Sequence, residues 1–479
     1  MEIKPSEISL KKSLIPVVLL ISLLFYNIIF FENNDWLGDY TYHYILIFTS
    51  FLAAILGISE GARINFIVKK IFSSIKSIST PIVILLLVGA LAGTWKVSGI
   101  IPAMVYYGLN LVDPAIFLPL TLFVSTLVSL TTGSSYTTSA TVGIALVAVG
   151  IAFNIPAGIT AGAVISGAYF GDKMSPLSDT TNLAPAMAGS DLYSHIRYMT
   201  YTTIPTYVIT LIVFIILSYS LDVSSAGEMS DINSLSNTIL NDFYVSPILF
   251  VVPAIVILLA FLKVKPVIAL SVGIFSAIIL SIIFQKNILN SIDSSTLNSL
   301  LKSVFTDTSI TTENFRIQRL YDSGGMKSML WTIYLTISAM IFGGSMDGIG
   351  ALKKITNFLL SKAKTTFGLF ASTALSCLGI NVVASDQYLA IVIPGKMFKD
   401  AFEEKNLSPV NLSRTLEDTG TVTSALIPWN TCGAYHYGVL GVSVTDYFVY
   451  AIFNWLSPIT TLIYAALMIK IKMISNHKF

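Results

Sequence analysis

Eight stretches of this chain are apolar for about the length that crosses a lipid bilayer. A spanning helix needs about 20 mostly apolar residues, because the hydrocarbon core holds no water to satisfy polar groups. Charged residues are only 11% of the 479 residues, less than half the ~25% of a soluble domain. The chain is therefore predicted to be an all-α polytopic membrane protein embedded in lipid, and its net charge of +2 does not indicate nucleic-acid binding. The apolar stretches are 14–31, 43–59, 80–96, 200–219, 244–262, 266–284, 328–346 and 448–469.

Two further regions, 112–192 and 365–445, are apolar but interrupted by Gly, Pro, Ser, Thr and carboxylates. Each is too long for one span and too broken for plain helices. Each is predicted to form a re-entrant hairpin followed by one discontinuous spanning helix, which gives about ten spanning helices and two hairpins. The rival count treats every hairpin arm as a full span. The predicted hairpins are 114–151 and 365–403, with turns at Gly133–Ser135 and Ala384–Gln387, and the predicted broken helices are 155–190 and 409–440.

Loop charges predict the orientation, because cytoplasmic loops collect Lys and Arg. The loops that hold bases are assigned to the cytoplasm and those that hold only acids to the outside, which places both termini in the cytoplasm. The basic segments are 4–12, 60–78, 263–265, 353–364 and 470–478, and the acidic ones are 32–40 and 220–242. The polar stretch 285–327 has mixed charge and no role that the sequence reveals.

The two halves of the chain repeat a pattern about 250 residues apart. Each half holds five predicted spans, an odd number, so the second half is predicted to be inverted in the membrane. Paired interrupted helices in inverted repeats are typical of secondary transporters, with the site at the interruptions. The alternative is a chance recurrence of apolar periodicity. The matched pairs are Gly93 with Gly343, Ser134 with Ser385, Asp172 with Asp418, and Pro205 with Pro458.

This repeat divides the chain into 1–219, an extracytoplasmic loop at 220–243, and 244–479. Within each half, plain helices precede a hairpin, a broken helix and a closing helix. The plain helices are 14–96 and 244–346, which the family resemblance given below implies to be a scaffold, the hairpin and broken-helix segments are 114–192 and 365–440, and the closing helices are 200–219 and 448–469.

Ionisable residues gather in the interruptions. Each costs roughly 2.5–3.5 kcal/mol in a membrane helix, so such groups must line a polar cavity, pair, or bind cations. Carboxylates outnumber bases, which favours cations such as Na+, and a carboxylate in a low dielectric can hold a proton or Na+ in competition. The ionisable set is Asp172, Lys173, Asp179, Asp386, Glu417 and Asp418, with Arg414 nearby, and the neutral ligand set is Thr132, Ser134, Ser135, Ser178, Thr180, Asn182, Thr421 and Asn430.

Several of these residues also have a purely structural interpretation. Asp172 can pair with its neighbour Lys173, Asp386 can cap a half-helix, and Glu417 can pair with Arg414. Asp179 and Asp418 are the preferred Na+ ligands, and Asp172 is the next candidate proton carrier. Replacing Asp179 or Asp418 by Asn is expected to abolish exchange.

The run from Gly167 to Leu183, which contains Asp172, Lys173 and Asp179, resembles the signature of NhaC-type Na+/H+ antiporters. The runs 132–135, 417–421 and 428–430 resemble the other marks of this family. The family lies in the ion transporter superfamily, and the resemblance implies a homodimer, an elevator motion of a transport domain, and a bacterial inner membrane. It implies transported Na+ and H+ with no cofactor and no enzymatic activity.

The family also contains exchangers that resemble malate/lactate antiporters, so Na+/H+-coupled exchange of an organic acid is the alternative, with Lys173 and Arg414 binding the carboxylate. Against it, Asp386 at the second hairpin turn would repel an anion. An aspartyl protease is disfavoured, because it gives the inverted repeat and the hydroxyl-rich breaks no role. A channel is a third possibility, and its flux would not couple two ions.

Overall fold

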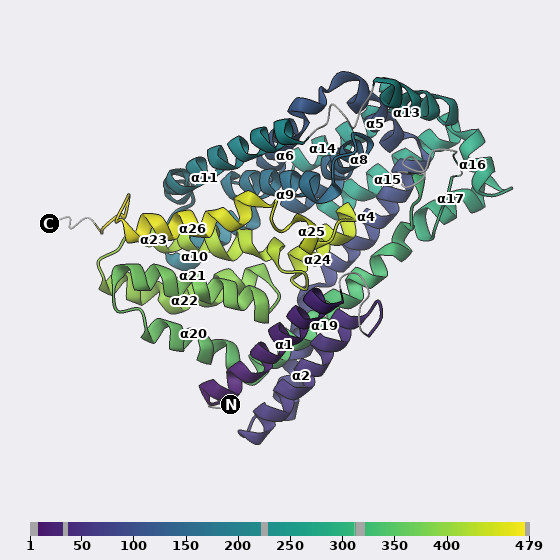
Figure 1. Cartoon of the computed structure of the whole chain (residues 1–479). Helices are drawn as coiled ribbons and strands as arrows, with labels where there is room; N and C mark the ends of the chain where they lie inside the picture. The colour runs from purple at the N-terminus through teal and green to yellow at the C-terminus, as the bar shows by residue number, and fades with distance from the viewer. Residues whose placement is uncertain (1–7, 32–36, 222–228, 311, 313–320, 475–479) are drawn as a thin grey trace.

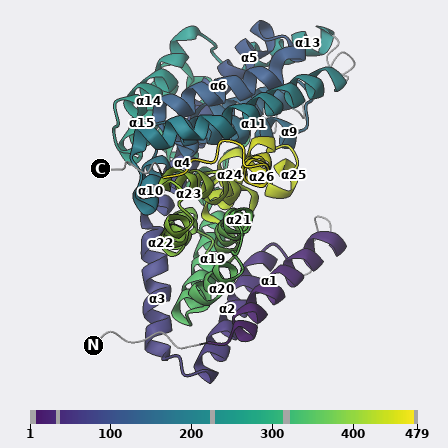
Figure 2. The same cartoon turned by 90° about the vertical axis from the view of Figure 1, so that its left-hand side faces the viewer.

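The computed structural model describes residues 8–31, 37–221, 229–310, 312 and 321–474, and this part of the chain is helical with only isolated β-bridges. Nine of its helices are long and apolar enough to cross a membrane, or ten if one bent pair counts as a span. The prediction of an all-α polytopic membrane protein is confirmed. Helices α1, α2 and α19 lie together at one end of the molecule, and α5 and α13 lie at the other (Figures 1 and 2).

Six predicted spans match long apolar helices: α1 (Leu10–Phe30), α2 (Thr41–Ser59), α4 (Ser79–Val97), α11 (Leu192–Ser220), α15 (Pro266–Phe284) and α19 (Leu330–Gly348). The predicted spans 244–262 and 448–469 contain shorter helices, α14 (Val251–Phe261) with 11 residues and α26 (Ile452–Ala466) with 15. Three of the nine candidates, at 114–132, 135–152 and 366–383, are the arms assigned above to hairpins. The number of crossings and the re-entrant character of these arms therefore stay predictions.

Two segments expected to be loops are helical. The basic stretch 60–78 forms α3 (Ile64–Ser77), which runs on into α4 as one apolar segment of 34 residues. The backbone of α3 packs directly on α19. A Cβ added to Gly344 of α19 would lie only 2.6 Å from the Cα of Ile71 in α3. The stretch 285–327 contains α16 (Lys286–Ile292) and α17 (Thr296–Phe305), and α17 lies against α4 (Figure 1). Packing on a neighbouring helix orders both segments, which loop charge alone does not reveal.

The predicted loops 32–40 and 220–242 are only partly described. Residues 32–36 and 222–228 lie outside the described residues, so the acidic charges of Glu32, Asp35, Asp222 and Glu228 have no structural account. The second loop ends in α13 (Met229–Asp242), whose part from Asn233 bends by 84° relative to the following helical segment 247–261.

The first interrupted region consists of two antiparallel helical arms and a split helix. The arms meet at a turn whose Gly133 has φ +67°, a left-handed conformation that glycine adopts without strain. A Cβ at Gly133 would lie 2.6 Å from that of Leu177, so this turn packs against the gap in the split helix. The arms are α6 (Phe117–Thr132) and α7 (Ser135–Thr138) with α8 (Ile144–Ala152), and the split helix is α9 (Ala157–Met174) with α10 (Asp179–Ala188).

The second interrupted region repeats this plan with a longer interruption. Ser385 at its turn has φ +58°, and its carbonyl oxygen accepts a hydrogen bond from the backbone N–H of Thr431 at 3.0 Å. This turn, too, therefore touches the interruption of its own split helix. The arms are α21 (Thr366–Val383) and α22 (Gln387–Glu404), and the split helix is α23 (Pro409–Leu416), a π-helical turn at 417–421, a 3-10 turn at 422–426 and α24 (Thr431–Leu440).

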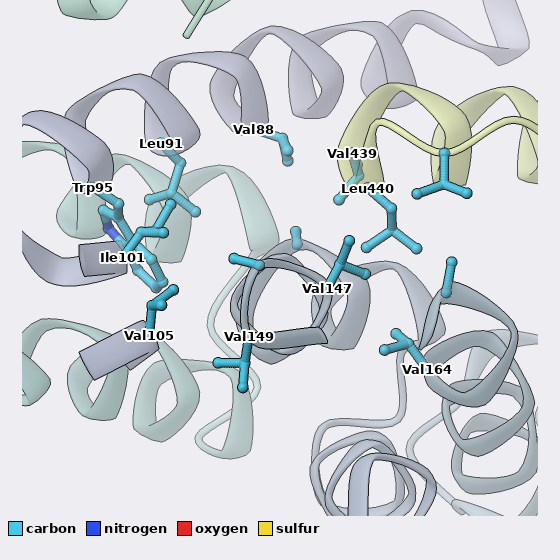
Figure 3. Packing of buried hydrophobic residues seen from close by; sticks show 14 of the residues in the cluster. Val88, Leu91, Trp95, Ile101, Val105, Val147, Val149, Val164, Val439 and Leu440 are labelled. Atoms are coloured by element: carbon cyan, nitrogen blue, oxygen red, sulfur yellow. The ribbon is translucent and has the colours of Figure 1, made fainter. Parts of the chain in front are cut away.

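An apolar core joins the two halves. Figure 3 shows side chains of α4, α5 (Ile100–Leu111), α8, α9 and α24 converging on one volume. Leu440 from the second half approaches Val164 and Gly143 from the first. The interdigitated branched side chains hold α9, which is half of the first split helix, close to α24, which is half of the second.

Candidate functional site

The interruptions of the two split helices lie side by side, so that residues about 245 positions apart in the chain touch. The α9 half ends at Met174, and the π-helical turn begins at Glu417. Lys173, Glu417 and Asp418 are all 0% exposed, and Asp172 is 8% exposed. Two adjacent ionisable residues of one split helix thus face two of the other inside the protein.

Lys173 and Asp418 form an ion pair between Nζ and Oδ1. The ammonium also donates to the hydroxyl of Ser457 at 3.2 Å. The second carboxylate oxygen of Asp418 accepts from Thr202 of α11 at 2.8 Å and from Thr461 of α26. Both oxygens of Asp418 are therefore occupied, one by the Lys173 ammonium and the other by two hydroxyls.

Glu417 is only half satisfied. Its Oε1 accepts from the hydroxyl of Thr180 at 3.0 Å, and that hydroxyl lies 3.1 Å from that of Ser178. Among the residues that the structure describes, its buried Oε2 has no hydrogen-bond partner of ordinary geometry, and the Thr421 hydroxyl lies one turn further on. Glu417 therefore offers one free carboxylate oxygen beside the hydroxyls of the first interruption.

The carboxylate of Asp172 contacts the turn between α6 and α7. Its Oδ2 accepts from the backbone N–H of Ser135 at 3.1 Å and from the hydroxyl of Ser135 at 2.8 Å. The alternative interpretation, a pair of Asp172 with Lys173, is not what the structure shows, because consecutive helical residues point to different faces and Lys173 pairs with Asp418. Asp172 instead ties the first hairpin to α9.

Most other predicted ligands of the first region surround this point. The hydroxyls of Ser134 and Ser178 cap helix starts, at the N–H of Thr137 (3.1 Å) and of Thr181 (3.5 Å). In the part of the chain that the structure describes, the buried Thr132 hydroxyl has no hydrogen-bond partner. Asp179 and Asn182, in contrast, lie on the exposed side of α10.

Asp386 and Asn430 hold the second region. Asp386 caps α22 by accepting from the N–H of Leu389 at 2.9 Å, which is the structural role considered for it above. Asn430 caps α24 at the N–H of Cys432 (3.0 Å), and its amide donates to the carbonyl of Asn381 at 3.0 Å. Asn381 in turn donates to the carbonyl of Gly420 at 2.7 Å. The amides of Asn430 and Asn381 thus satisfy carbonyls near the end of α21 and in the π-helical turn.

Arg414 has no counter-charge within hydrogen-bonding distance. It is 0% exposed, and its Nε, Nη1 and Nη2 have no hydrogen-bond partner in the described part of the chain. Its guanidinium lies over the ring of Tyr198 at 4.5 Å. The considered pairing with Glu417 is absent, since that carboxylate bonds to Thr180 instead.

A family model, the Na+/H+ antiporter family, matches residues 167–469, which include both interruptions. The chain belongs to the Na+/H+ antiporter family. The antiporter NhaC of Alkalihalophilus pseudofirmus is 38% identical over 89% of this chain and 90% of its own length, and NhaC of Bacillus subtilis is 36% identical over 82% and 85%. The malate-2H+/Na+-lactate antiporter of Bacillus subtilis is 33% identical over 85% and 84%.

A solved structure, that of Neisseria gonorrhoeae MtrF, aligns over 90% of this chain and 96% of its own with a TM-score of 0.41 and 14% identity, a likeness too remote to bear on the site. As a member of an antiporter family, the chain is a transporter and not an enzyme.

In this Na+/H+ antiporter family member, sequence reasoning missed part of the polar centre. Thr202, Ser457 and Thr461, which surround Asp418, lie on plain apolar helices and were not singled out. A helical Thr can satisfy its own backbone, so a hydroxyl on such a helix carries little information. Thr202, Thr206 and Thr210 recur at a spacing of four on α11, and this stripe was the one available signal.

Proposed function

We propose that this protein exchanges Na+ for H+ across a membrane through the buried Lys173–Asp418 pair and the open carboxylate of Glu417. The observation that carries the proposal is that ion pair, because it joins the two split helices where the protein is least able to solvate charge. Its relatives named as Na+/H+ antiporters are similar over most of their length.

Competition for Asp418 is the coupling step. Na+ and the Lys173 ammonium carry like charges and cannot both occupy the same carboxylate oxygen at low cost. When Na+ binds, the ammonium leaves Asp418 and releases one proton, becoming a neutral amine. When Na+ leaves, the amine takes up a proton again and the pair re-forms. At this pair, the binding of one Na+ releases one H+, and the release of one Na+ is accompanied by the uptake of one H+.

The ligands of Na+ come from both interruptions. Asp418 and Glu417 supply carboxylate oxygens, and Ser178, Thr180 and Thr421 supply hydroxyls beside Glu417. Asp172 stays with Ser135 as a second proton carrier. The other predicted ligands shape the surrounding helix ends; these residues are Thr132, Ser134, Asn182, Asp386 and Asn430. Asp179 is exposed and attracts cations to the interruptions.

The larger architecture follows the same proposal. Each hairpin turn touches the interruption of its own split helix, at Gly133 with Leu177 and at Ser385 with Thr431, which supports two inverted repeats with re-entrant hairpins. The transport parts, 114–219 and 365–469, move as one unit against the scaffold helices in an elevator motion. The scaffold helices form a homodimer surface in a bacterial inner membrane, with both termini in the cytoplasm.

A reconstituted vesicle assay with a pH-sensitive dye tests the function. Sodium chloride added to vesicles of the wild type should move protons, and D418N and E417Q should not, while D400N, an exposed carboxylate of α22, should behave as wild type. D179N, because Asp179 is exposed, should raise the Na+ concentration needed for half-maximal exchange without abolishing it. Exchange in D418N at the wild-type rate would refute the proposed coupling.

Exchange of an organic acid is the second candidate, and the buried guanidinium of Arg414 favours it, since Arg binds carboxylates through two parallel hydrogen bonds. One relative is a malate-2H+/Na+-lactate antiporter. The same vesicles should then respond to sodium malate or sodium lactate but not to sodium chloride. A response to chloride alone supports cation exchange.

A further inference from the structure

The helix α20 (Ala351–Ser361) is an exposed linker between two apolar helices. It joins α19 to α21, and both of these are long and apolar enough to cross a membrane. Its place in the chain therefore puts it at the boundary between lipid and water. Figure 1 shows α20 at the edge of the molecule, where it packs against α1, α21 and α22.

All charged residues of this linker have the same sign. Between Asp347 and Asp386 the sequence has four lysines and no carboxylate. All four lysines are exposed, and within the described part of the chain no carboxylate forms an ion pair with any of them. Four ammonium groups thus lie at the boundary without a counter-charge from the protein. They belong to Lys353, Lys354, Lys362 and Lys364.

The elements around α20 do not neutralise this charge. Asp347, at the end of α19, pairs with Lys70 at 2.7 Å. The helix α21 has no charged residue, and α1 has only two lysines. The helix α22 and the residue after it hold three acids and three bases, so together they add no net charge. The acids are Asp400, Glu403 and Glu404, and the bases are Lys396, Lys399 and Lys405.

The two sides of α20 differ in what covers them. Ala351, Leu352 and Thr356 are at most 3% exposed, so this side packs on the protein. The opposite side is exposed, and its residues recur at helical spacing. It includes the ring of Phe358, which is 40% exposed, and Nζ of Lys362 lies 5.3 Å from the centre of that ring. The exposed face consists of Lys353, Lys354, Asn357, Phe358, Ser361 and Lys362.

The first half of the chain has a helix in the corresponding place, without such a face. The helix α5 follows α4 as α20 follows α19, and each begins after a left-handed glycine, Gly99 with φ +79° and Gly350 with φ +77°. Residues 98–112 have no charged side chain, and α5 buries most of its residues in the apolar core. Membrane orientation explains an excess of bases in a loop. It does not require that the bases share one face with an exposed aromatic ring.

We propose that the exposed face of α20 binds the headgroups of anionic phospholipids. The surface potential of an anionic leaflet attracts lysines that lie close to it. A helix with basic and aromatic residues on its lipid side can lie in the interface, with its rings at the boundary of the acyl chains. The lysines then contact lipid phosphates, while Phe358 and the 45% exposed Phe367 contact acyl chains. This role goes beyond the proposed Na+/H+ exchange and does not depend on it.

A second copy of the chain is the competing occupant of this face. In a symmetric dimer the same face of each copy would meet, which would place four unpaired lysines opposite four others. Repulsion between like charges disfavours that contact. An anionic leaflet, in contrast, supplies the opposite charge that the neighbouring elements do not supply.

The experiment measures lipid binding to the full chain through its thermal midpoint in detergent micelles, because a ligand that binds only the folded protein raises the midpoint. Phosphatidylglycerol or phosphatidylcholine is added at increasing mole fraction. Phosphatidylglycerol should raise the wild-type midpoint more than phosphatidylcholine does. In K353Q/K354Q/K362Q/K364Q, the mole fraction of phosphatidylglycerol for half of this rise should increase by about tenfold or more, because each lysine near an anionic surface contributes about fivefold.

Two control variants keep the number of charges or their position separate. K353R/K354R/K362R/K364R retains the charges and should stay within about threefold of the wild type. K69Q/K76Q/K263Q/K265Q removes four exposed lysines outside α20 and should also stay within about threefold. Potassium chloride at about 0.5 M should remove the preference of the wild type for phosphatidylglycerol, because salt screens exposed charges.

Four results would overturn the proposal. The first is an equal effect of the two lipids on the wild type, and the second is an equal loss in the α20 variant and in K69Q/K76Q/K263Q/K265Q. The third is a rise with glycerol 3-phosphate as large as that with phosphatidylglycerol, which would assign a free phosphate to α20. The fourth is a changed oligomeric mass of the α20 variant with no effect of phosphatidylglycerol, which would assign a second copy. Because the midpoint involves no transport step, a failure of Na+/H+ exchange would not alter these outcomes.

Discussion

The two interruptions at the centre of the protein are built in different ways. The first is a short gap, residues 175–178, between α9 and α10, and its own side chains satisfy it. The Thr181 hydroxyl donates to the carbonyls of Asp172 and Lys173, at 3.2 and 3.0 Å, and Asn182 donates to that of Ser178 at 2.7 Å. The first interruption is thus encoded within about ten residues of sequence.

The second interruption draws on distant residues. It runs through π-helical and 3-10 turns before a turn at 427–430. Asn381 from α21 and Asn454 from α26 donate to the carbonyls of Gly420 and Val422, at 2.7 and 2.8 Å. π-helical turns recur at functional sites. Here the turn carries Glu417 and Asp418 themselves, so the tertiary contacts that stabilise the second interruption also position the two carboxylates proposed to bind Na+.

The largest expected effect comes from the ion pair that joins the interruptions. K173Q leaves Asp418 as a buried charge without a cation and should lower the free energy of unfolding by about 3–5 kcal/mol. D418N should have a similar effect for the opposite reason. Exchange should be lost in both, and denaturant or thermal unfolding in detergent measures the stability.

The double variant K173Q/D418N is the control for this effect. It removes both charges, so it should be more stable than either single variant, although it does not exchange ions. A double variant as unstable as the sum of the two single variants would show that the pair is not what joins the interruptions.

The next effect tests the dependence of the second interruption on α21. N381A removes the donor to Gly420 and to the Thr423 hydroxyl (3.1 Å), and should cost about 2–3 kcal/mol of stability. Because the π-helical turn then shifts, exchange should also fall. The matched control is N110A, an exposed amide that also makes two hydrogen bonds, at 2.7 and 3.2 Å. Equal losses in the two variants would contradict the distinction between the interruptions.

A smaller effect is expected at the first interruption. S178A removes the cap of α10 and should cost about 1 kcal/mol, with a reduction in exchange because Thr180 loses its neighbour. S443A removes the cap of the short helix α25 (Val444–Tyr447) and should destabilise the protein by a similar amount without slowing exchange. If S178A slowed exchange as strongly as N381A, the first interruption would not be the self-sufficient one.

The same contrast explains how much could be predicted from the sequence. The turns at Gly133–Ser135 and Ala384–Gln387 were located correctly, because Gly, Ser and Asp mark left-handed turns and helix starts locally. The sequence did not reveal Asp418 as the partner of Lys173. Asp172 is adjacent to Lys173 in the sequence, whereas Asp418 is adjacent to it in space. Pairing across the two halves depends on how the split helices pack, which local residue patterns do not encode.

The smallest effect lies outside the centre, in α16 and α17, and gives a region that should be independent of the site. A hydrogen bond from Lys302 at 2.8 Å, and then one from the N–H of Ser295, lower the pKa of Asp293 to about 2 from 3.8. A lowered pKa stabilises the fold above the unfolded value, and this contribution is lost as the pH falls from about 4 to about 2. Hydrogen exchange of the α17 amides, corrected for intrinsic rates, should therefore accelerate over this range in the wild type. In D293N, hydrogen exchange of the α17 amides should already be faster at neutral pH, and it should change less over the same pH range. Because Asp293 lies at the surface and is partly exposed, solvent screening keeps this effect small, and Na+/H+ exchange by D293N should equal that of the wild type. Slower Na+/H+ exchange by D293N would mean that α16 and α17 influence the interruptions. The difference between the two interruptions would then not be confined to their own contacts.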